Sequence, residues 1–478
     1  MSIQLYPFQQ EDVQHLQGQK SVAILNEMGT GKTIEAVARD FQISQEADGQ
    51  TLVVAPLGAL DTWREVLLDL QFPDLHRDDV ISITDGRDDF LKSLIKGDHT
   101  IYLMNWDNLR LPTKSVKRTL WAGDVLYPVL TKTKFLHVIA DEAHKAKNRK
   151  AQQAIALKRI KTVWKTALTG TPITNKPDDL WSILNWLYPK VWTSYWKFVN
   201  YYTIVHEETN WATRKSYRII EGVKNGAELQ ETIAPYTVKH KKVEVAPQLP
   251  EKYYSSITVE LDPKQRRAYD SMLKNMVAWI GENEEQTLVA SAIVARLQRL
   301  QQFAISHAEI QERVNRDGEI EQHVVLREPS SKLDAVMDLI ESNPEQKFVV
   351  FTQFRGAVEL LMARLEAAKI EASIIIGGQS AEVRKDEIEK FISERQIIVG
   401  TIAAGGVALD GLQVASTVVF VDRTWSPPLN AQAEDRLHRF GQKNAVQVID
   451  IIAKNTVDRG RAQKLIIKRG WTRDLLGI

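Results

Sequence analysis

A glycine-rich run that ends in lysine and threonine, Asn26–Thr33, has the residue types and spacing of a phosphate loop. It follows a short apolar segment and opens a stretch whose apolar residues have helical spacing, which is the context that such a loop requires. Glycines let backbone amides curl around phosphate oxygens, and a helix N-terminus adds a favourable dipole. Lys32 is expected to reach the β- and γ-phosphates, and the Thr33 hydroxyl is expected to ligate Mg²⁺. The predicted nucleotide-binding residues of the loop are Gly29, Thr30, Gly31, Lys32 and Thr33.

The loop departs from the common pattern G-x-x-x-x-G-K-[ST] at its first position, where Asn26 replaces glycine. A flexible turn without a ligand is the alternative interpretation of this segment.

Two carboxylates form the second candidate group, in Asp141-Glu-Ala-His144 directly after the apolar run FLHVIA. A strand that ends in this way places them at the carboxyl edge of a sheet, where open α/β folds bind ligands. We predict that Asp141 holds Mg²⁺, directly or through water, and that Glu142 orients and polarises the attacking water. A solvated strand exit is the alternative, and the phosphate loop upstream favours the catalytic interpretation.

Two arginines form the third candidate group, in QAEDRLHR from Gln432 to Arg439. Arg436 and Arg439 are three residues apart, a spacing that places them on one face of a helix. Two guanidinium groups on one face are costly unless an anion faces them, and a triphosphate is such an anion. As arginine fingers they would stabilise the charge that develops in phosphoryl transfer. A surface helix in which Glu434 and Asp435 pair with these arginines accounts equally well for the pattern.

The elements that must position these groups alternate between strands and helices in two separate blocks. The predicted strands of the first block are Ser21–Asn26, Thr51–Pro56, Thr100–Asn105, Phe135–Asp141 and Lys165–Gly170. Those of the second block are Lys347–Thr352, Ala372–Gly378, Ile397–Thr401, Thr417–Asp422 and Val446–Ala453. This alternation predicts an α/β fold of two lobes, with mainly parallel sheets flanked by helices. The region between the blocks is rich in aromatic residues early and helical later, and we interpret it as helical protrusions from the two lobes.

Composition narrows the class of protein. The chain has 478 residues, a formal net charge of +1 and no cysteine. Disulfides, a thiol nucleophile and a structural zinc site with Cys ligands are therefore excluded. We expect no signal peptide, because the start MSIQLYPFQQEDV has no basic segment that leads into an apolar run. We expect no membrane partner, because the apolar run Ile397–Val421 contains four glycines and fits two buried strands better than a membrane span. We expect a cytoplasmic protein of a bacterial or virus-infected cell.

Nucleic acid, if it is the partner, must bind to local basic groups, since the average charge is neutral. One group follows the carboxylates, a second lies near Lys239 and Lys241, and a third is C-terminal; each could equally be a solvated face. Trp63, Trp106 and Trp425 lie beside the motif segments and could stack on bases, although core packing is the commoner role of tryptophan.

Nine segments of the chain occur in the order of the helicase motifs of superfamily two. They are LYPFQQ, NEMGTGKT, VVAPLGALDTW, MNWDNL, DEAHKAKN, LTGTPITN, VVFTQF, TIAAGG and QAEDRLHRFGQ. The spellings DEAHKAKN and DRLHRFGQ resemble the switch/sucrose-nonfermenting branch, the chromatin-remodeller-like double-stranded DNA translocases. The resemblance extends over about residues 5 to 455.

This resemblance implies two RecA-like lobes with an ATPase site between them. It implies that residues 1–246 form the ATP-binding lobe, with a protrusion from about 177. Residues 247–455 would form the second lobe, with a protrusion at about 263–328, and residues 456–478 a basic helix that packs back on the lobes. By the same resemblance Gln9 recognises adenine, Gln432 joins the catalytic arginines, and the residues that couple ATP to DNA contact are His144, Thr169, Thr171, Lys239, Lys241, Gly405 and Gly406.

The resulting expectation is an ATP- and Mg²⁺-dependent hydrolase that moves along double-stranded DNA as its lobes close. A helicase that separates strands or remodels forks, acting on single-stranded or forked DNA, would use the same motor residues. A scaffold that is gated by nucleotide and does not sustain turnover is an alternative of another class. RNA stays possible as a partner, because phosphate contacts alone do not distinguish the sugars.

Overall fold

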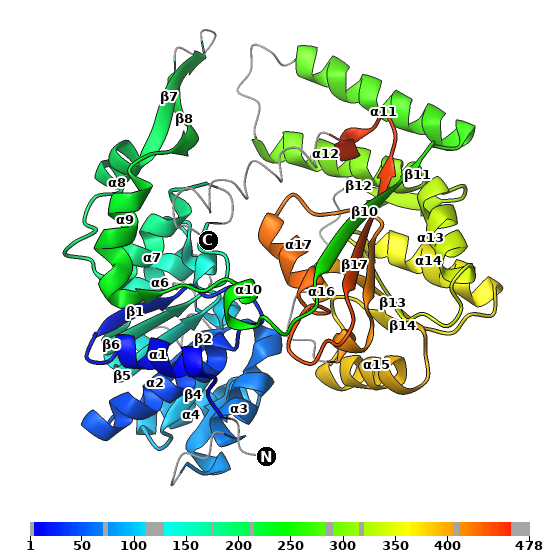
Figure 1. Ribbon diagram of the computed structural model, residues 1–478. Helices are drawn as coiled ribbons and strands as arrows, with labels where there is room; N and C mark the ends of the chain where they lie inside the picture. Colours follow the sequence, from blue (N-terminus) through cyan, green and yellow to red (C-terminus); the bar gives the residue numbers. More distant parts are fainter. Residues whose placement is uncertain are drawn as a thin grey trace. The chain divides into compact units, whose positions relative to one another are not determined.

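The structure, a computed structural model, describes residues 4–69, 75–109, 129–173, 176–210, 215–282, 290–314, 320–405 and 411–459. The chain divides into two compact units (Figure 1). The first is built mainly from residues up to His206 together with Ile219–Pro247, and the second mainly from Gln248 onward. Both are α/β units on parallel sheets, which confirms the predicted fold class.

The first unit contains a seven-stranded sheet in the order β3-β4-β2-β5-β6-β1-β9, in which every pair of neighbours is parallel. Its strands read as apolar runs because helices cover both faces of such a sheet. Their bounds are β1 (Ser21–Ile24), β2 (Thr51–Ala55), β3 (Val80–Ser82), β4 (Ile101–Asn105), β5 (Lys134–Asp141), β6 (Lys161–Leu168) and β9 (Thr237–Val238).

Three of these strands end level with one another. Ile24 of β1 pairs with Leu168 of β6, and Leu168 pairs with Asp141 of β5. The loops after β1, β5 and β6 therefore leave the same edge of the sheet side by side. These loops carry the phosphate loop, the two carboxylates and the LTGTP segment.

The helices of the first unit pack against this sheet or form its aromatic protrusion (Figure 1). They are α1 (Pro7–His15), α2 (Lys32–Glu46), α3 (Leu60–Asp69), α4 (Arg87–Lys96), α6 (Gln152–Arg159), α7 (Asp179–Leu187), α8 (Tyr195–Tyr202), α9 (Gly226–Ile233) and α10 (Lys242–Val245). Buried polar bonds fix α2 to the sheet. Its Asp40 accepts hydrogen bonds from Thr51 Oγ1 at 2.7 Å and binds His137 Nδ1 at 2.6 Å. The first turn of α2, which carries Lys32 and Thr33, is thus held by the same layer that holds the strands.

The second unit contains a six-stranded parallel sheet in the order β10-β17-β16-β13-β15-β14. Its strands are β10 (Lys252–Val259), β13 (Phe348–Thr352), β14 (Ala372–Ile375), β15 (Ile397–Thr401), β16 (Thr417–Phe420) and β17 (Val446–Ala453). Its helices are α11 (Pro263–Glu282), α12 (Ala290–Ile305), α13 (Ser331–Glu341), α14 (Arg355–Ala367), α15 (Ala381–Ser393), α16 (Ile402–Gly405) and α17 (Pro427–Glu434). The apolar run Ile397–Val421 contains β15 and β16, as predicted. Within the described ranges, no helix has the length and apolarity of a membrane span.

Two antiparallel hairpins add to the helices of the protrusions. One joins β7 (Thr203–Asn210) to β8 (Lys215–Val223), and the other joins β11 (His307–Val314) to β12 (Ile320–Arg327). The sequence pattern predicts only helices in these regions. The strands carry β-branched residues such as Ile204, Val205, Ile219 and Ile220, which favour extended backbone, but without the length of run that marks a core strand.

Candidate active site

The phosphate loop joins β1 to α2, as the sequence predicts. Gly29 and Gly31 have φ values of 76° and 86°, a left-handed backbone that residues with a Cβ rarely adopt. The Thr30 side chain is buried and its hydroxyl donates to the Glu27 carbonyl at 2.9 Å. Lys32 Nζ donates to the carbonyls of Asn26 and Glu27, each at 2.9 Å. The Lys32 amine therefore lies against the backbone of its own loop, where the phosphate oxygens of a nucleotide would bind.

Gln9 contacts this loop directly. Its side chain is buried; Oε1 accepts from the Tyr6 amide at 2.9 Å, and Nε2 donates to the Thr30 carbonyl at 3.0 Å. A Cβ on Gly31 would lie 2.6 Å from Gln9 Nε2, which shows how closely the Gln9 amide approaches the loop. The structure thus brings Gln9 to the nucleotide-binding loop, while its recognition of adenine stays a prediction.

Asn26, the departure from the usual loop pattern, lies at the centre of a buried polar cluster. Its amide nitrogen donates to Asp12 Oδ2 at 2.9 Å and to both oxygens of Glu35 at 3.2 and 3.0 Å. His240 Nε2 binds the other oxygen of Asp12 at 2.8 Å. Burial raises the pKa of Glu35 to about 8, and the charge of Asp12 adds to this effect. The amide of Asn26 therefore separates two buried carboxyl groups beneath the loop, a role that glycine could not fill.

Asp141 is oriented by two tryptophans. Trp63 Nε1 donates to Asp141 Oδ2 at 2.9 Å, and Trp106 Nε1 donates to the Asp141 carbonyl at 2.8 Å. Both indoles are buried, so their predicted alternative as base-stacking residues is wrong and core packing is confirmed. Their hydrogen bonds to Asp141 are a function that the sequence analysis missed. The available signal was the position of each tryptophan within a motif segment, VVAPLGALDTW and MNWDNL.

Glu142 follows Asp141 in a left-handed backbone conformation with a φ of 51°. His144 Nδ1 lies 3.1 Å from Glu142 Oε2 and 3.2 Å from Thr169 Oγ1. Thr171 Oγ1 lies 3.4 Å from the same ring nitrogen, and the Thr171 amide donates to Thr169 Oγ1 at 3.1 Å. His144 therefore joins the loop after β5 to the loop after β6, while the coupling role predicted for these residues stays a prediction. A Cβ on Gly170, between the two threonines, would lie 3.2 Å from Lys32 Nζ, so all three loops converge.

The residues present suit a nucleotide with bound Mg²⁺. Burial and the charge of Glu142 raise the pKa of Asp141 to about 6, against the opposing effects of Trp63 and Lys32. A divalent cation beside Asp141 would favour its charged form. The hydroxyl of Thr33 belongs to the first turn of α2, so a hydroxyl and a carboxylate are available at the same sheet edge.

The basic segment before the second unit is tied to the phosphate loop. The Glu27 amide donates to the His240 carbonyl at 3.0 Å, and the Lys242 amide donates to Glu27 Oε2 at 2.7 Å. Lys239 Nζ donates to Gln230 Oε1 at 3.1 Å, and the Lys241 amide donates to Glu244 Oε2 at 3.1 Å. Lys239 and Lys241 are therefore sequence neighbours of His240 and Lys242, whose backbones bind Glu27 of the phosphate loop. Their contact with DNA stays a prediction.

Gln432, Arg436 and Arg439 belong to the second unit, and the structure corrects their expected setting. Helix α17 ends at Glu434, and residues 435–441 form turns and bends, so Arg436 and Arg439 do not share one helix face. The side chains of Gln442 and His438 bind backbone carbonyls in this region, which stabilises a non-helical backbone after Glu434. Gln442 Nε2 donates to the carbonyls of Leu437, Gln413 and Ala415 at 3.3, 3.1 and 2.8 Å, and His438 Nε2 binds the Pro250 carbonyl at 2.7 Å.

The acidic residues before these arginines have other cationic partners. Glu434 Oε1 binds Arg423 Nη1 at 2.6 Å, and Asp435 Oδ1 binds Lys252 Nζ at 2.8 Å. Tyr254 donates to Glu434 Oε2 at 2.9 Å. These bonds fix the end of α17 to β10.

Gly405 ends α16, where a Cβ would lie 2.3 Å from the Phe351 ring, so the close approach requires glycine. Gly406 lies outside the described residues, as does the C-terminal basic group beyond Arg459. Trp425, the third tryptophan considered for base stacking, is partly exposed and donates to Gln301 Oε1 at 2.9 Å.

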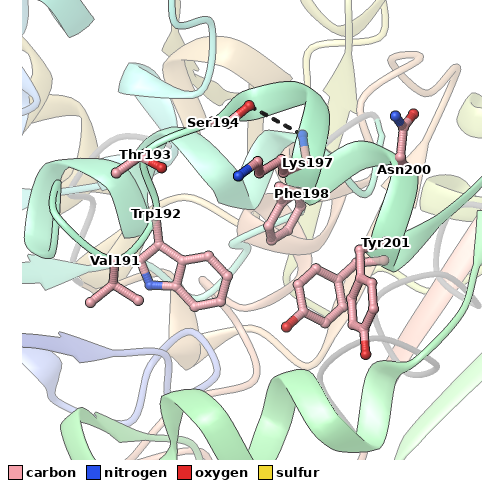
Figure 2. Close-up of a pocket in the computed structure, with 9 residues that line it drawn as sticks. Val191, Trp192, Thr193, Ser194, Lys197, Phe198, Asn200 and Tyr201 are labelled. Carbon is pink, nitrogen blue, oxygen red and sulfur yellow. Dashed lines mark hydrogen bonds between the residues drawn. The ribbon is translucent and has the colours of Figure 1, made fainter.

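A separate hollow of about 500 Å³ lies in the aromatic region of the first unit. Figure 2 shows the rings of Trp192, Phe198 and Tyr201 around it, with Lys197 on the same helix. None of the sequence-predicted site residues lines this hollow. Within the first unit, the structure thus gathers Gln9, the phosphate loop, the two carboxylates, His144 and the threonine pair at another place, the carboxyl edge of the sheet.

Comparison with known proteins gives two family matches. The model of the SNF2-related domain matches residues 9–308, and the model of the helicase conserved C-terminal domain matches residues 331–441. An uncharacterized ATP-dependent helicase of Mycoplasma pneumoniae is 27% identical over 463 residues, which cover 94% of this chain and 40% of that protein. Transcription regulatory protein SNF2 of Saccharomyces cerevisiae is 23% identical over 468 residues, 96% of this chain and 26% of that protein.

Lymphoid-specific helicase of Homo sapiens is 23% identical, over 93% of this chain and 59% of that protein. The chain spans less than two thirds of the length of each of these curated relatives. Among solved structures, the SWI2/SNF2 ATPase core of Sulfolobus solfataricus in complex with dsDNA aligns with a TM-score of 0.42 and 24% identity. That alignment covers 100% of this chain and 93% of the other.

Proposed function

Because the chain belongs to the SNF2-related family, we propose that it is an ATP-driven motor that moves along double-stranded DNA. The observation that carries this proposal is the convergence of three loops at one sheet edge. The loops after β1, β5 and β6 lie side by side and carry Lys32, the Asp141–Glu142 pair and the Thr169–Thr171 segment, respectively. His144 links the last two loops.

Each residue of this edge has a defined task in the proposal. Lys32 exchanges its two carbonyl partners for the β- and γ-phosphates, and the amides around Gly29 and Gly31 surround the phosphate oxygens. Thr33 and Asp141 would hold Mg²⁺, which would neutralise phosphate charge when bound. Glu142 orients the attacking water and accepts its proton, while His144 holds the carboxylate in place.

The arginines complete the site in this proposal. Closure of the two units brings Arg436 and Arg439 onto the phosphates, where their fixed positive charge stabilises the transition state. The bonds of Glu434 and Asp435 to Arg423 and Lys252 support this role, because they fix the segment that carries the arginines. Bound DNA favours the closed state, so hydrolysis is stimulated by DNA through linkage.

The test is ATP hydrolysis titrated with duplex DNA, single-stranded DNA, forked DNA and RNA at two salt concentrations. The proposal expects the largest stimulation by duplex, with an apparent affinity that falls steeply as salt rises. Equal turnover with and without every nucleic acid would contradict the motor. Binding of ATP without multiple turnovers would instead identify a nucleotide-gated scaffold, and preference for RNA would reassign the substrate.

Strand separation is the second candidate, and the β7–β8 hairpin favours it. The hairpin stands out from α8 and α9 in Figure 1, and its described side chains beyond Val205 on β7 are exposed. Glu207 and Arg218 form an ion pair at 2.7 Å that joins the two strands of the hairpin. Such a feature could act as a wedge between strands. Unwinding of a forked substrate that is lost when residues 206–219 are replaced by a short Gly-Ser turn, with duplex-stimulated hydrolysis retained, would establish this second activity.

A further inference from the structure

Arginine and lysine side chains that lie over aromatic rings fall into two classes in this protein. Seven such pairs occur in the part of the chain that the structure describes. In five of them the cation also donates to a nearby oxygen. These are Arg39 to Leu16 O, Lys165 to Trp186 O, Arg266 to Lys454 O, Lys347 to Phe391 O, and Arg423 to Glu434 Oε1. Arg149 and Lys158 are the other two, and neither has a hydrogen-bond acceptor or an ion pair among the described residues.

These two cations are neighbours. Arg149 Cζ lies 4.3 Å from the centroid of the Tyr195 ring, and Lys158 Nζ lies 4.8 Å from the centroid of the Trp181 ring. The two rings are in edge contact, with centroids 5.5 Å apart. Tyr195 is itself fixed, because its hydroxyl donates to Asp178 Oδ2 at 2.5 Å. The adjacent rings of Trp181 and Tyr195 therefore support Lys158 and Arg149 next to each other.

The arrangement has an energetic cost as it stands. Burial lowers the pKa of Lys158 to about 8, and the positive charge of Arg149 acts in the same direction. Partly buried like charges without an acceptor destabilise a fold unless an anion compensates them. The nearby Trp181 adds a buried indole N–H that has no hydrogen-bond partner within the described ranges. The site therefore holds two cations, Arg149 and Lys158, together with the carboxylate of Asp178, whose Oδ1 also has no hydrogen-bond partner within the described ranges.

We propose that Arg149 and Lys158 form a binding site for a phosphate of the nucleic-acid backbone. A guanidinium group binds two phosphate oxygens at once, and an ammonium group beside it supplies a point charge. The exposed side chains of Lys145 and Lys150 extend the positive surface on the same segment after β5. The identity of the phosphate rests on the proposed function, because the motor follows a nucleic acid. The site is distinct from the phosphate loop, which receives the nucleotide.

The experiment measures binding of a fluorescently labelled duplex to the full chain by anisotropy, without nucleotide, over a series of salt concentrations. A variant that no longer neutralises one DNA phosphate should have a slope of log affinity against log salt that is shallower by about 0.9. Arg149→Gln and Lys158→Met are each expected to show this change and to bind the duplex several-fold more weakly. Arg149→Lys keeps the charge and should retain most of the slope.

Lys165→Met is the matched control. Lys165 also lies over a tryptophan, at 6.0 Å from the Trp186 ring, but its amine is already bound by the Trp186 carbonyl at 2.7 Å. Its replacement should leave the salt slope of the wild type. Thermal unfolding of each variant separates a loss of binding from a loss of fold, and a misfolded glutamine variant leaves Arg149→Lys and Lys158→Met to decide.

Wild-type affinity and slope in both Arg149→Gln and Lys158→Met would overturn the proposal, as would failure of the wild type to bind duplex at all. A polyglutamate peptide serves as the second arm. If its binding is lost in the variants while duplex binding is unchanged, the site recognises an acidic protein and the proposal is wrong. Because the assay uses no ATP, its result does not depend on ATP turnover. If the wild type binds duplex through Arg149 but its hydrolysis is not stimulated by DNA, the proposed motor is contradicted and the phosphate site is retained.

Discussion

Replacement of Asn26 by glycine would restore the usual phosphate-loop pattern, yet we predict that it destabilises this protein. The Asn26 amide separates Asp12 from Glu35, two carboxyl groups that are both buried. In Asn26→Gly the two groups lose their shared donor, and Asp12 keeps only its bond to His240. The prediction is opposite in sign to what the sequence pattern alone would suggest.

The magnitude follows from the hydrogen bonds that the substitution removes. At pH 7 Glu35 is mostly protonated, because burial raises its pKa to about 8, so its bond to Asn26 counts as a neutral one of about 0.5–1.5 kcal/mol. The bond to Asp12 is charge-assisted and counts for about 1.5–3 kcal/mol. The sum is a loss of about 2–4.5 kcal/mol from the free energy of unfolding of the first unit. At about 1.4 kcal/mol for each factor of ten, this is roughly a 30- to 1,600-fold change in its folding equilibrium.

This loss of stability can be measured by urea unfolding without nucleotide. Amide hydrogen exchange of α2 and β1 reports the unfolding of the first unit specifically. The double variant Asn26→Gly/Glu35→Gln should recover part of the stability, because it removes one of the two facing carboxyl groups. Asn26→Asp should be worse than Asn26→Gly, since it adds a third carboxyl group. An Asn26→Gly protein as stable as the wild type would refute the interpretation of this cluster.

Four further predictions concern catalysis and stability. Lys32→Ala should abolish productive binding of ATP, measured by titration with a fluorescent nucleotide. Glu142→Gln should bind ATP but release no phosphate in a multiple-turnover assay, and near-wild-type hydrolysis would remove Glu142 from the mechanism. Arg439→Ala should lower turnover by about 10³-fold or more while ATP still binds, and an unchanged rate would exclude it as an arginine finger. Burial lowers the pKa of His137 below its ordinary 6.5, so the unfolded chain binds the proton more readily than the folded protein. The free energy of unfolding should therefore fall as the pH drops below about 6.5. In urea unfolding between pH 7.5 and 5.5, His137→Gln should reduce this dependence on pH.

Ten of the thirteen described strands of the two sheets were predictable because they are apolar runs bounded by polar residues. All ten predicted strands occur, among them Phe135–Asp141, whose end at Asp141 agrees with β5. The short strands β3 and β9 and the hairpin strands lack such a run. β10 carries the exposed Tyr253 and Tyr254, so its pattern does not resemble that of a buried strand. Its place at the edge of the sheet depends on pairing with β17, a contact far apart in sequence.

The phosphate loop and the carboxylates could be located from sequence because both are local motifs at strand ends. The bonds that orient them could not. Trp63 and Trp106 reach Asp141 across 78 and 35 positions of the chain, and His240 reaches Asp12 across 228. The error at Arg436 and Arg439 has the same origin. Their spacing fits a helix, but bonds from Gln442 and His438 to distant carbonyls divert the backbone after Glu434.

The proposed motor requires residues of both units to act on one nucleotide, and a measured distance between the units is the sharpest test of this requirement. The chain has no cysteine, so Gln14→Cys on α1 and Asn444→Cys before β17 provide two exposed sites for spin labels. We predict that ATP and duplex DNA convert the distance distribution in the Glu142→Gln background to a narrower one that differs from that of the free protein. The further changes Arg436→Ala and Arg439→Ala should abolish this shift. A nucleotide-bound protein whose distribution equals that of the free protein would contradict the shared site.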